Sequence, residues 1–167
     1  MTDLTIALAG NPNAGKTTIF NVLTGLHQHT GNWPGKTVEK KEGEIQHGTL
    51  KINIVDLPGT YSLTAYSPEE IIARDFIIQE HPDVVINVVD ATNLERNLYL
   101  TVQILELDVP VVIALNMADD LHKNGAKINL DQLSQLLGDI PIVSTTANQG
   151  KGISDLISKA VRAARKN

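Results

Sequence analysis

The sequence of 167 residues contains no cysteine, which excludes disulfide bonds, thiolate zinc centres and iron–sulfur clusters. No stretch approaches the roughly 18 consecutive apolar residues that a membrane-spanning helix requires. The start of the chain lacks the basic segment, apolar core and cleavage site of a signal peptide, so we expect no secretory leader. Basic residues do not dominate either. The formal net charge is −5, which argues against a nucleic-acid-binding protein.

The remaining composition is ordinary for a globular protein, with 42% hydrophobic and 20% charged residues. The length fits a single domain over residues 1–167 with a substantial core. Strand-like runs alternate with helical patterns, which predicts an α/β fold: a six-stranded, mostly parallel sheet with one antiparallel edge strand and helices on both faces. The expected strands are Leu4–Ala9, Val38–Gln46 (the edge strand), Leu50–Asp56, Val84–Asp90, Val111–Asn116 and Ile140–Val143.

Capping patterns and periodicity predict the helices. The pattern S-P-E-E at residues 67–70 is a capping box with proline at the first helical position. A second box, T-N-L-E at residues 92–95, predicts a helix that ends near Leu107. Two more helices are expected from Lys16 to about Leu26 and over Leu130–Leu137. We expect buried faces formed by Leu94, Leu98, Val102 and Leu105 after the second box, and by Ile153, Leu156, Ile157, Ala160, Val161 and Ala164 on a final helix.

The most informative segment is residues 10–17, G-N-P-N-A-G-K-T, which matches the phosphate-binding loop G-x-x-x-x-G-K-[ST]. It lies between an expected strand and an expected helix, the setting in which backbone N–H groups and a helix start bind a polyphosphate. Lys16 is expected to reach the β- and γ-phosphates, and the Thr17 hydroxyl to bind Mg²⁺. The predicted phosphate-binding residues are Gly10, Asn11, Pro12, Asn13, Ala14, Gly15, Lys16, Thr17 and Thr18.

Three further motifs follow expected strands: D-L-P-G, N-M-A-D, and S-T-T at residues 144–146, where a backbone N–H can reach the guanine carbonyl. Together with the phosphate-binding loop they predict that the nucleotide is GTP. In D-L-P-G at residues 56–59, Asp56 can hold Mg²⁺ through water, and the Gly59 N–H can approach a γ-phosphate. In N-M-A-D at residues 116–119, the Asp119 carboxylate can accept hydrogen bonds from N1–H and N2–H₂ of guanine, a donor pair that adenine lacks. The carboxyl ends of such strands meet at one edge of the sheet. The predicted base-binding residues are Asn116, Met117, Asp119, Ser144, Thr145 and Thr146.

Residues 27–37 show no periodicity and contain the only tryptophan. A loop of this length in a compact domain usually has a function. It lies where a GTPase needs a threonine that contacts Mg²⁺ and the γ-phosphate, and Thr37 is our candidate. Three roles stay open for Trp33: a lid over the nucleotide, an anchor for a partner, or an exposed loop residue.

The motifs together resemble those of the translation-factor-like GTPases. Five segments, residues 10–18, 31–39, 56–63, 70–75 and 89–100, resemble the FeoB family of prokaryotic ferrous iron transporters. The N-W-P-G pattern at residues 32–35 separates this family from other bacterial GTPases. The resemblance implies a Ras-like P-loop GTPase domain that binds GTP and GDP at the cytoplasmic face of the cell membrane. It also implies helical and transmembrane domains in cis that lie outside this chain, and a homo-oligomer through the switch regions.

The resemblance further implies slow GTP hydrolysis, for which the expected catalytic residues are Lys16, Asn13, Thr37 and Gly59. Thr60 stands where many GTPases have a water-orienting glutamine, and Met117 replaces a common lysine. In related GTPases an asparagine at the position of Asn13 can bind K⁺, which neutralises charge in place of an arginine finger. The expected metal ligands are Thr17, Thr37 and Asp56 for Mg²⁺, and Asn13 with the Gly31 and Trp33 carbonyls for K⁺.

Three functions remain open at this point. GTP hydrolysis can drive or gate ferrous iron uptake, or GTP occupancy can act as a sensor in the same transporter. The third possibility is a stand-alone GTPase linked to the ribosome or tRNA. It predicts a basic surface, which the composition does not favour.

Overall fold

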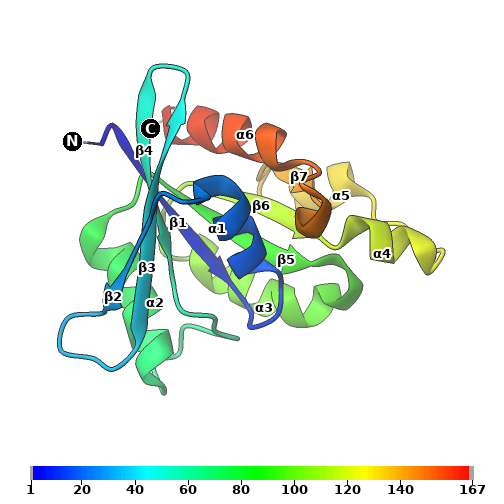
Figure 1. The fold of residues 1–167 in the computed structure, drawn as a ribbon. Coiled ribbons are helices and arrows are strands. Elements are labelled where there is room, and N and C mark those ends of the chain that lie inside the picture. The colour runs from blue at the N-terminus through cyan, green and yellow to red at the C-terminus, as the bar shows by residue number, and fades with distance from the viewer. Residues whose placement is uncertain (1, 166–167) are drawn as a thin grey trace.

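The computed structural model describes residues 2–165 and has a single mixed sheet at its centre, with helices on both faces (Figure 1). The strand order is β2-β3-β4-β1-β5-β6-β7. All neighbouring strands are parallel except where β3 pairs with β2 and with β4. The α/β class is therefore confirmed. The strands are β1 (Leu4–Gly10), β2 (Gln28–Asn32), β3 (Glu39–His47), β4 (Leu50–Asp56), β5 (Val84–Asp90), β6 (Val111–Asn116) and β7 (Ile142–Ser144).

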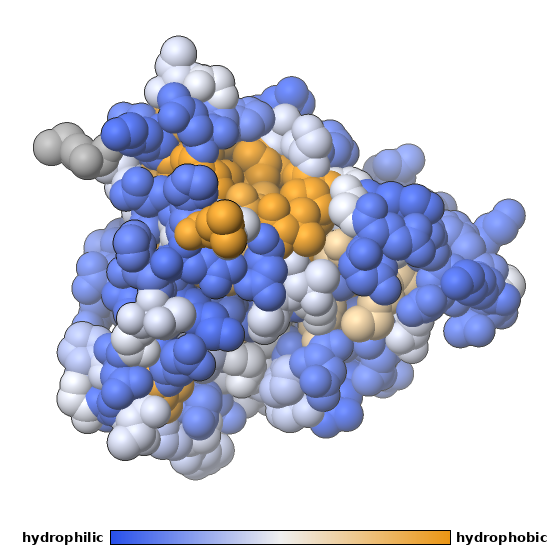
Figure 2. All heavy atoms as spheres, in the orientation of Figure 1, coloured by the Kyte–Doolittle hydropathy of each residue, from blue (hydrophilic) through white to orange (hydrophobic). Residues whose placement is uncertain are grey.

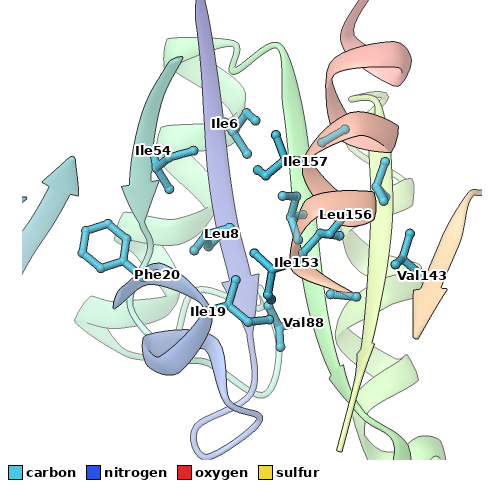
Figure 3. Packing of buried hydrophobic residues seen from close by; sticks show 14 of the residues in the cluster. Ile6, Leu8, Ile19, Phe20, Ile54, Val88, Val143, Ile153, Leu156 and Ile157 are labelled. Carbon is cyan, nitrogen blue, oxygen red and sulfur yellow. The ribbon is translucent and has the colours of Figure 1, made fainter. Parts of the chain in front are cut away.

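Two hydrophobic clusters attach the helices to the two faces of the sheet. Helices α1 and α6 cover one face, and α2 and α3 cover the other. On the first face, Ile19 and Phe20 of α1 pack with Leu156 and Ile157 of α6 over the strand residue Leu8 (Figure 3). The helices are α1 (Lys16–Thr24), α2 (Pro68–Glu80), α3 (Leu94–Leu105), α4 (Ala118–Lys123), α5 (Leu130–Leu136) and α6 (Ile153–Arg165), with 3₁₀ turns η1 (Ala91–Asn93) and η2 (Ala147–Gln149).

The sheet has seven strands rather than the six expected, because the segment predicted as a loop contains β2. Strand β2 forms the edge of the sheet, and β3, expected at the edge, lies inside it. The side chains of β2 are polar and mostly exposed, so the strand carries no alternating hydrophobic signal. It is held by backbone pairing with β3.

The first capping box is confirmed and the second is wrong. The Ser67 hydroxyl accepts a hydrogen bond from the Glu70 N–H at 3.2 Å. Thr92 instead donates its hydroxyl hydrogen to Asp90 at 2.6 Å, and residues 91–93 form η1, so α3 begins at Leu94 without a side-chain cap. Asp90 caps the turn instead, because its carboxylate accepts a hydrogen bond from the Thr92 N–H at 2.9 Å.

The predicted buried face of α3 is right only in part. Leu94 and Leu105 pack against the core as partly buried residues, whereas Val102 is 48% exposed. The residues fully buried on α3 are Asn97, Leu100, Thr101 and Ile104. Thr101 donates a hydrogen bond to the Asn87 side chain of β5, and Asn87 donates to the Ala9 carbonyl at 3.3 Å. Polar residues occupy buried positions here because they pair with each other, so a hydrophobic pattern alone does not identify the centre of the buried face.

The face shown in Figure 2 is mostly hydrophilic, and its largest apolar area lies around α1 and α6. Two large exposed hydrophobic residues come from this region: Val22 on α1, and Leu26 just after it, which is fully exposed. Among residues 2–165, no helix combines the length and the apolar character needed to cross a membrane.

Candidate functional site

The loop between β1 and α1 is shaped by two glycines that no other residue can replace without strain. A Cβ on Gly10 would lie 2.8 Å from the Val88 carbonyl oxygen. Gly15 has a φ of 95°, and a Cβ there would lie 2.0 Å from the Asn116 side-chain nitrogen. Positive φ and close approach are both tolerated by glycine alone. The phosphate-binding pattern therefore forms the tight turn that it predicts, next to β5 and β6.

Lys16 and Asp56 face each other at the phosphate end of the loop. Their side chains are 9% and 8% exposed, and the Lys16 ammonium forms a salt bridge with the Asp56 carboxylate. Burial raises the pKa of Asp56, and the opposing effect of the Lys16 charge does not cancel this. Strands β1 and β4 bring the two residues together because Asp56 lies opposite Leu8 in the parallel pairing. A bound phosphate would offer Lys16 a second anionic partner.

The segment after Asp56 lies directly against the phosphate-binding loop. The Thr60 N–H donates to the Gly10 carbonyl at 3.1 Å. A Cβ on Gly59 would lie 3.3 Å from the Pro12 Cα atom, so this glycine permits close contact between the two segments. The structure therefore brings the D-L-P-G and G-N-P-N-A-G-K-T motifs together.

The Asn116 side chain joins three segments of the site. Its Nδ2 atom donates to the Ala14 carbonyl at 3.0 Å. Its Oδ1 atom accepts from the Thr145 hydroxyl at 3.0 Å and from the Ala147 N–H at 3.1 Å. The amide is 3% exposed, and these contacts satisfy its donor and its acceptor. Ala147 was not predicted, because a contact made by a backbone N–H leaves no residue-type signal.

Asp119 lies at the start of α4 beside a cavity of about 210 Å³. Its N–H donates to the Thr146 hydroxyl at 3.3 Å, and Lys151 donates to its carboxylate at 3.0 Å. The hydrogen bond from Lys151 holds the pKa of Asp119 below its ordinary value, so the carboxylate stays an ionised acceptor. Sequence reasoning missed Lys151, which is 32 positions away. The cavity is lined by Gly15, Thr18, Asn116, Met117, Asp120, Lys123, Thr146, Ala147, Asn148 and Gln149.

The structure does not bring the segment around Trp33 to the phosphate-binding loop. Thr37 is exposed in the turn between β2 and β3, and Gly31 pairs with Lys40 inside the β2–β3 ladder. The Trp33 carbonyl accepts a hydrogen bond from the Lys36 N–H at 2.9 Å. The roles of Thr37, Gly31 and Trp33 as metal ligands therefore stay predictions, and they require this hairpin end to change conformation.

Trp33 itself is a core residue, neither exposed nor a lid over the phosphate-binding loop in this conformation. It is 7% exposed, and its ring packs edge-on against Phe76 of α2 with centroids 5.7 Å apart. The Lys40 ammonium lies over the Trp33 ring, 4.9 Å from its centroid. The contact links the segment before Thr37 to the helix that follows the D-L-P-G motif.

Glu70 organises residues 62–66, between the D-L-P-G motif and α2. Its carboxylate accepts hydrogen bonds from the Tyr66 N–H at 3.0 Å, from the Thr64 hydroxyl at 3.0 Å and from the Ser62 hydroxyl at 3.3 Å. The Tyr66 N–H is the largest of the causes that lower the pKa of Glu70. A group whose pKa is lowered by folding stabilises the fold above its unfolded pKa, and this contribution disappears as pH falls through the folded pKa.

We therefore expect residues 62–66 to lose order in acid before the rest of the domain unfolds. Amide exchange of Tyr66, corrected for intrinsic pH dependence, should accelerate as pH falls below the ordinary glutamate pKa of 4.5. The change Glu70→Gln should remove this pH dependence, because an amide does not titrate there. Glu69→Gln is the matched control on the same helical turn. The same acid transition in the Glu70→Gln protein would contradict the prediction.

Comparison with known proteins identifies the chain. A family model for ferrous iron transport protein B matches residues 4–160. The Fe(2+) transport protein A/Fe(2+) transporter FeoB fusion protein of Porphyromonas gingivalis is 54% identical over 157 residues, which cover 93% of this chain and 18% of that protein. The Fe(2+) transporter FeoB of Escherichia coli K12 is 51% identical over 160 residues and is covered to 21%. The chain thus spans about a fifth of these relatives.

Solved structures match along the whole fold. The FeoB G-domain from Methanococcus jannaschii is 48% identical with a TM-score of 0.86, and the match covers 100% of both chains. The cytosolic domain of the T. maritima FeoB iron transporter in a GDP form is 47% identical with a TM-score of 0.93, over 98% of this chain and 64% of that one. The chain therefore belongs to the FeoB family, ferrous iron transport protein B, and has the P-loop GTPase fold of its G domain.

Proposed function

We propose that this domain binds GTP and GDP with Mg²⁺ and hydrolyses GTP slowly, with stimulation by K⁺. The observation that carries the proposal is that three motifs meet at the carboxyl ends of β1, β4 and β6. Lys16 forms a salt bridge with Asp56, Gly59 lies close to Pro12, and Asn116 donates a hydrogen bond to Ala14. Ligands of open α/β sheets bind at this edge. The GDP form of the T. maritima relative supports the same nucleotide.

The residues present fit Mg²⁺ bound jointly with a nucleotide. Among residues 2–165 there is no group of three or more His, Asp or Glu side chains that could hold a metal ion without other ligands. Mg²⁺ usually takes one or two carboxylates together with substrate phosphates. Asp56 and Thr17 would hold the ion, with Thr37 joining them after the hairpin end moves. The bound ion would neutralise phosphate charge.

K⁺ would add to the positive charge that Lys16 and Mg²⁺ supply at the reacting phosphate. Thr60 is 5% exposed and offers no amide to orient water. Asn13 lies at the tip of the phosphate-binding loop with a φ of 69°, beside a cavity. A cation bound by its side-chain oxygen would supply positive charge near the terminal phosphate, as an arginine finger does in other GTPases.

For the longer proteins of this family, we propose that the nucleotide cycle of this domain drives or gates ferrous iron uptake. The domain would act at the cytoplasmic face of the membrane, with helical and transmembrane domains in cis, and would form a homo-oligomer through the switch segments. Family membership does not favour the two alternatives, a nucleotide-sensing switch in the same transporter or a stand-alone ribosome- or tRNA-linked GTPase.

The fluorescence of Trp33, the only tryptophan, tests the proposal. Addition of a non-hydrolysable GTP analogue with Mg²⁺ should change the emission, because Thr37 must move to the γ-phosphate and carries the Trp33 segment with it. GDP should bind with a smaller change, and ADP should not bind. Thr37→Ala should still bind GDP but lose the extra change caused by the analogue.

Two results would argue against the proposal. Equal affinities for ADP and GDP in calorimetry would contradict the proposed selectivity for guanine. Identical Trp33 emission with saturating GDP and with the saturating GTP analogue would contradict the proposed movement of the Thr37 segment toward the γ-phosphate. Thr30→Ala, on the neighbouring β2 strand, is the matched control and should respond to the analogue as the unmutated domain does.

A further inference from the structure

Arg96 occupies a place that its helix does not explain. It is the third residue of α3, where the helix dipole disfavours a cation. Its guanidinium carbon lies 4.3 Å from the centroid of the Tyr61 ring, in the geometry of a cation–π contact. The partner therefore lies outside the helix, in the segment that follows the D-L-P-G motif.

The Arg96–Tyr61 pair borders the phosphate-binding loop. Both residues line a cavity of about 200 Å³ that is also lined by residues 11–14. The other lining residues are Asp90, Asn93 and Asn97. Asp90 already accepts hydrogen bonds from the Thr92 N–H and hydroxyl, and no salt bridge to Arg96 is found among residues 2–165. The contact with Tyr61 is thus the specific interaction of this guanidinium.

Tyr61 lies two residues after Gly59 and one after Thr60, whose N–H is bonded to Gly10. Within the described part of the chain, no side chain of residues 58–61 takes part in a hydrogen bond. The ring contact with Arg96 is therefore a side-chain attachment of this segment to the rest of the domain. Fixing the ring restricts the backbone at Gly59, which contacts Pro12.

We propose that Arg96 is a positioning residue for the terminal phosphate of GTP. Through Tyr61, it keeps the Gly59 backbone beside Pro12. The Gly59 N–H can then bind the γ-phosphate without a further loss of backbone conformational entropy. GDP lacks that phosphate, so the contact favours GTP over GDP. The inference rests on the proposed function, because it needs a γ-phosphate at this loop.

Calorimetry with GDP and with a non-hydrolysable GTP analogue, both with Mg²⁺, tests the proposal. Arg96→Leu and Tyr61→Leu should each weaken analogue binding about two- to five-fold, the effect of an exposed cation–π contact, and leave GDP binding unchanged. Tyr61→Phe should bind as the unmutated domain does, because it keeps the ring. The double variant Arg96→Leu/Tyr61→Leu should be no weaker than either single variant.

Arg74→Leu is the matched control, since the one ion pair that this arginine of α2 forms with any of residues 2–165 is with its neighbour Asp75. The inference is overturned if Arg96→Leu weakens GDP and analogue equally, if the two leucine changes add, or if Tyr61→Phe behaves like Tyr61→Leu. Unchanged analogue binding in Arg96→Leu overturns it as well, while the proposed function stands. If the unmutated domain binds neither nucleotide, the proposed function fails, and the inference fails with it.

Discussion

Asp119→Asn is expected to change the base preference of the domain from guanine to xanthine. The carboxylate can accept two hydrogen bonds from guanine, and each bond to a charged acceptor contributes about 1.5–3 kcal/mol. The asparagine oxygen can still accept from N1–H, but its NH₂ group cannot accept from N2–H₂, so the loss of this second bond should weaken GDP binding by about 10–10²-fold. The new amide can donate to the carbonyl oxygen that xanthine carries in place of the guanine amino group, so xanthosine diphosphate should bind more tightly than GDP. Calorimetric titration with both nucleotides measures the change.

Asp131→Asn on α5 is the control, since it removes one exposed carboxylate away from the cavity. It should keep the guanine preference. The Asp119 variant also frees Lys151, which donates to Asp119 at 3.0 Å. The double variant Asp119→Asn/Lys151→Gln therefore separates the effect of the lysine from that of the base contact. A variant that loses GDP without gaining the xanthine nucleotide would contradict the base-selecting role of Asp119.

GTP turnover should be faster in KCl than in NaCl at equal ionic strength, and Asn13→Ala should abolish the difference. An arginine finger accelerates hydrolysis on the order of 10³–10⁵-fold, and a monovalent cation should supply only part of this. Na⁺ and Cs⁺ should be less effective, because an oxygen cage matched to K⁺ fits them less well. Release of inorganic phosphate, measured in each salt, gives the rates.

Equal rates in the two salts would show that K⁺ does not accelerate GTP hydrolysis and would contradict the prediction. A potassium effect that survives in Asn13→Ala would instead remove this residue from the cation site. Asn124→Ala, at the end of α4, is a control asparagine outside the phosphate-binding loop and should retain the potassium effect. GDP affinity should be similar in all these proteins, which separates a loss of catalysis from a loss of binding.

Much of the fold could be predicted because most strands are buried and strongly apolar. The buried run at Val84–Val89, for example, indicates a central strand by composition alone. Strand β2 could not be predicted, because its polar side chains face solvent and only its backbone pairs. Asn97 and Thr101 were missed as buried residues for a related reason. Their burial depends on partners, the Asp90 N–H and the Asn87 side chain, and not on hydropathy.

The motifs predicted which segments meet at this edge of the sheet but not the long-range side-chain contacts around them. Lys16 and Asp56 meet because Lys16 comes after β1 and Asp56 ends β4, the parallel neighbour of β1. Arg96 and Lys151 contact partners about 30 or more positions away, so their spacing carries no signal. The burial of Trp33 depends on Phe76, which belongs to a different element. Such long-range contacts are created by the fold and have no local pattern.

The three hydrogen bonds of Asn116 have a consequence for how sequence changes combine in this domain. One buried amide serves the loop before α1, the end of β6 and the segment after β7. Changes at positions that share a partner do not add in free energy, whereas distant and independent changes do. Substitutions near Ala14, Thr145 and Ala147 should therefore show epistasis with one another. The effect of a substitution in one of these three segments therefore depends on the sequence of the other two.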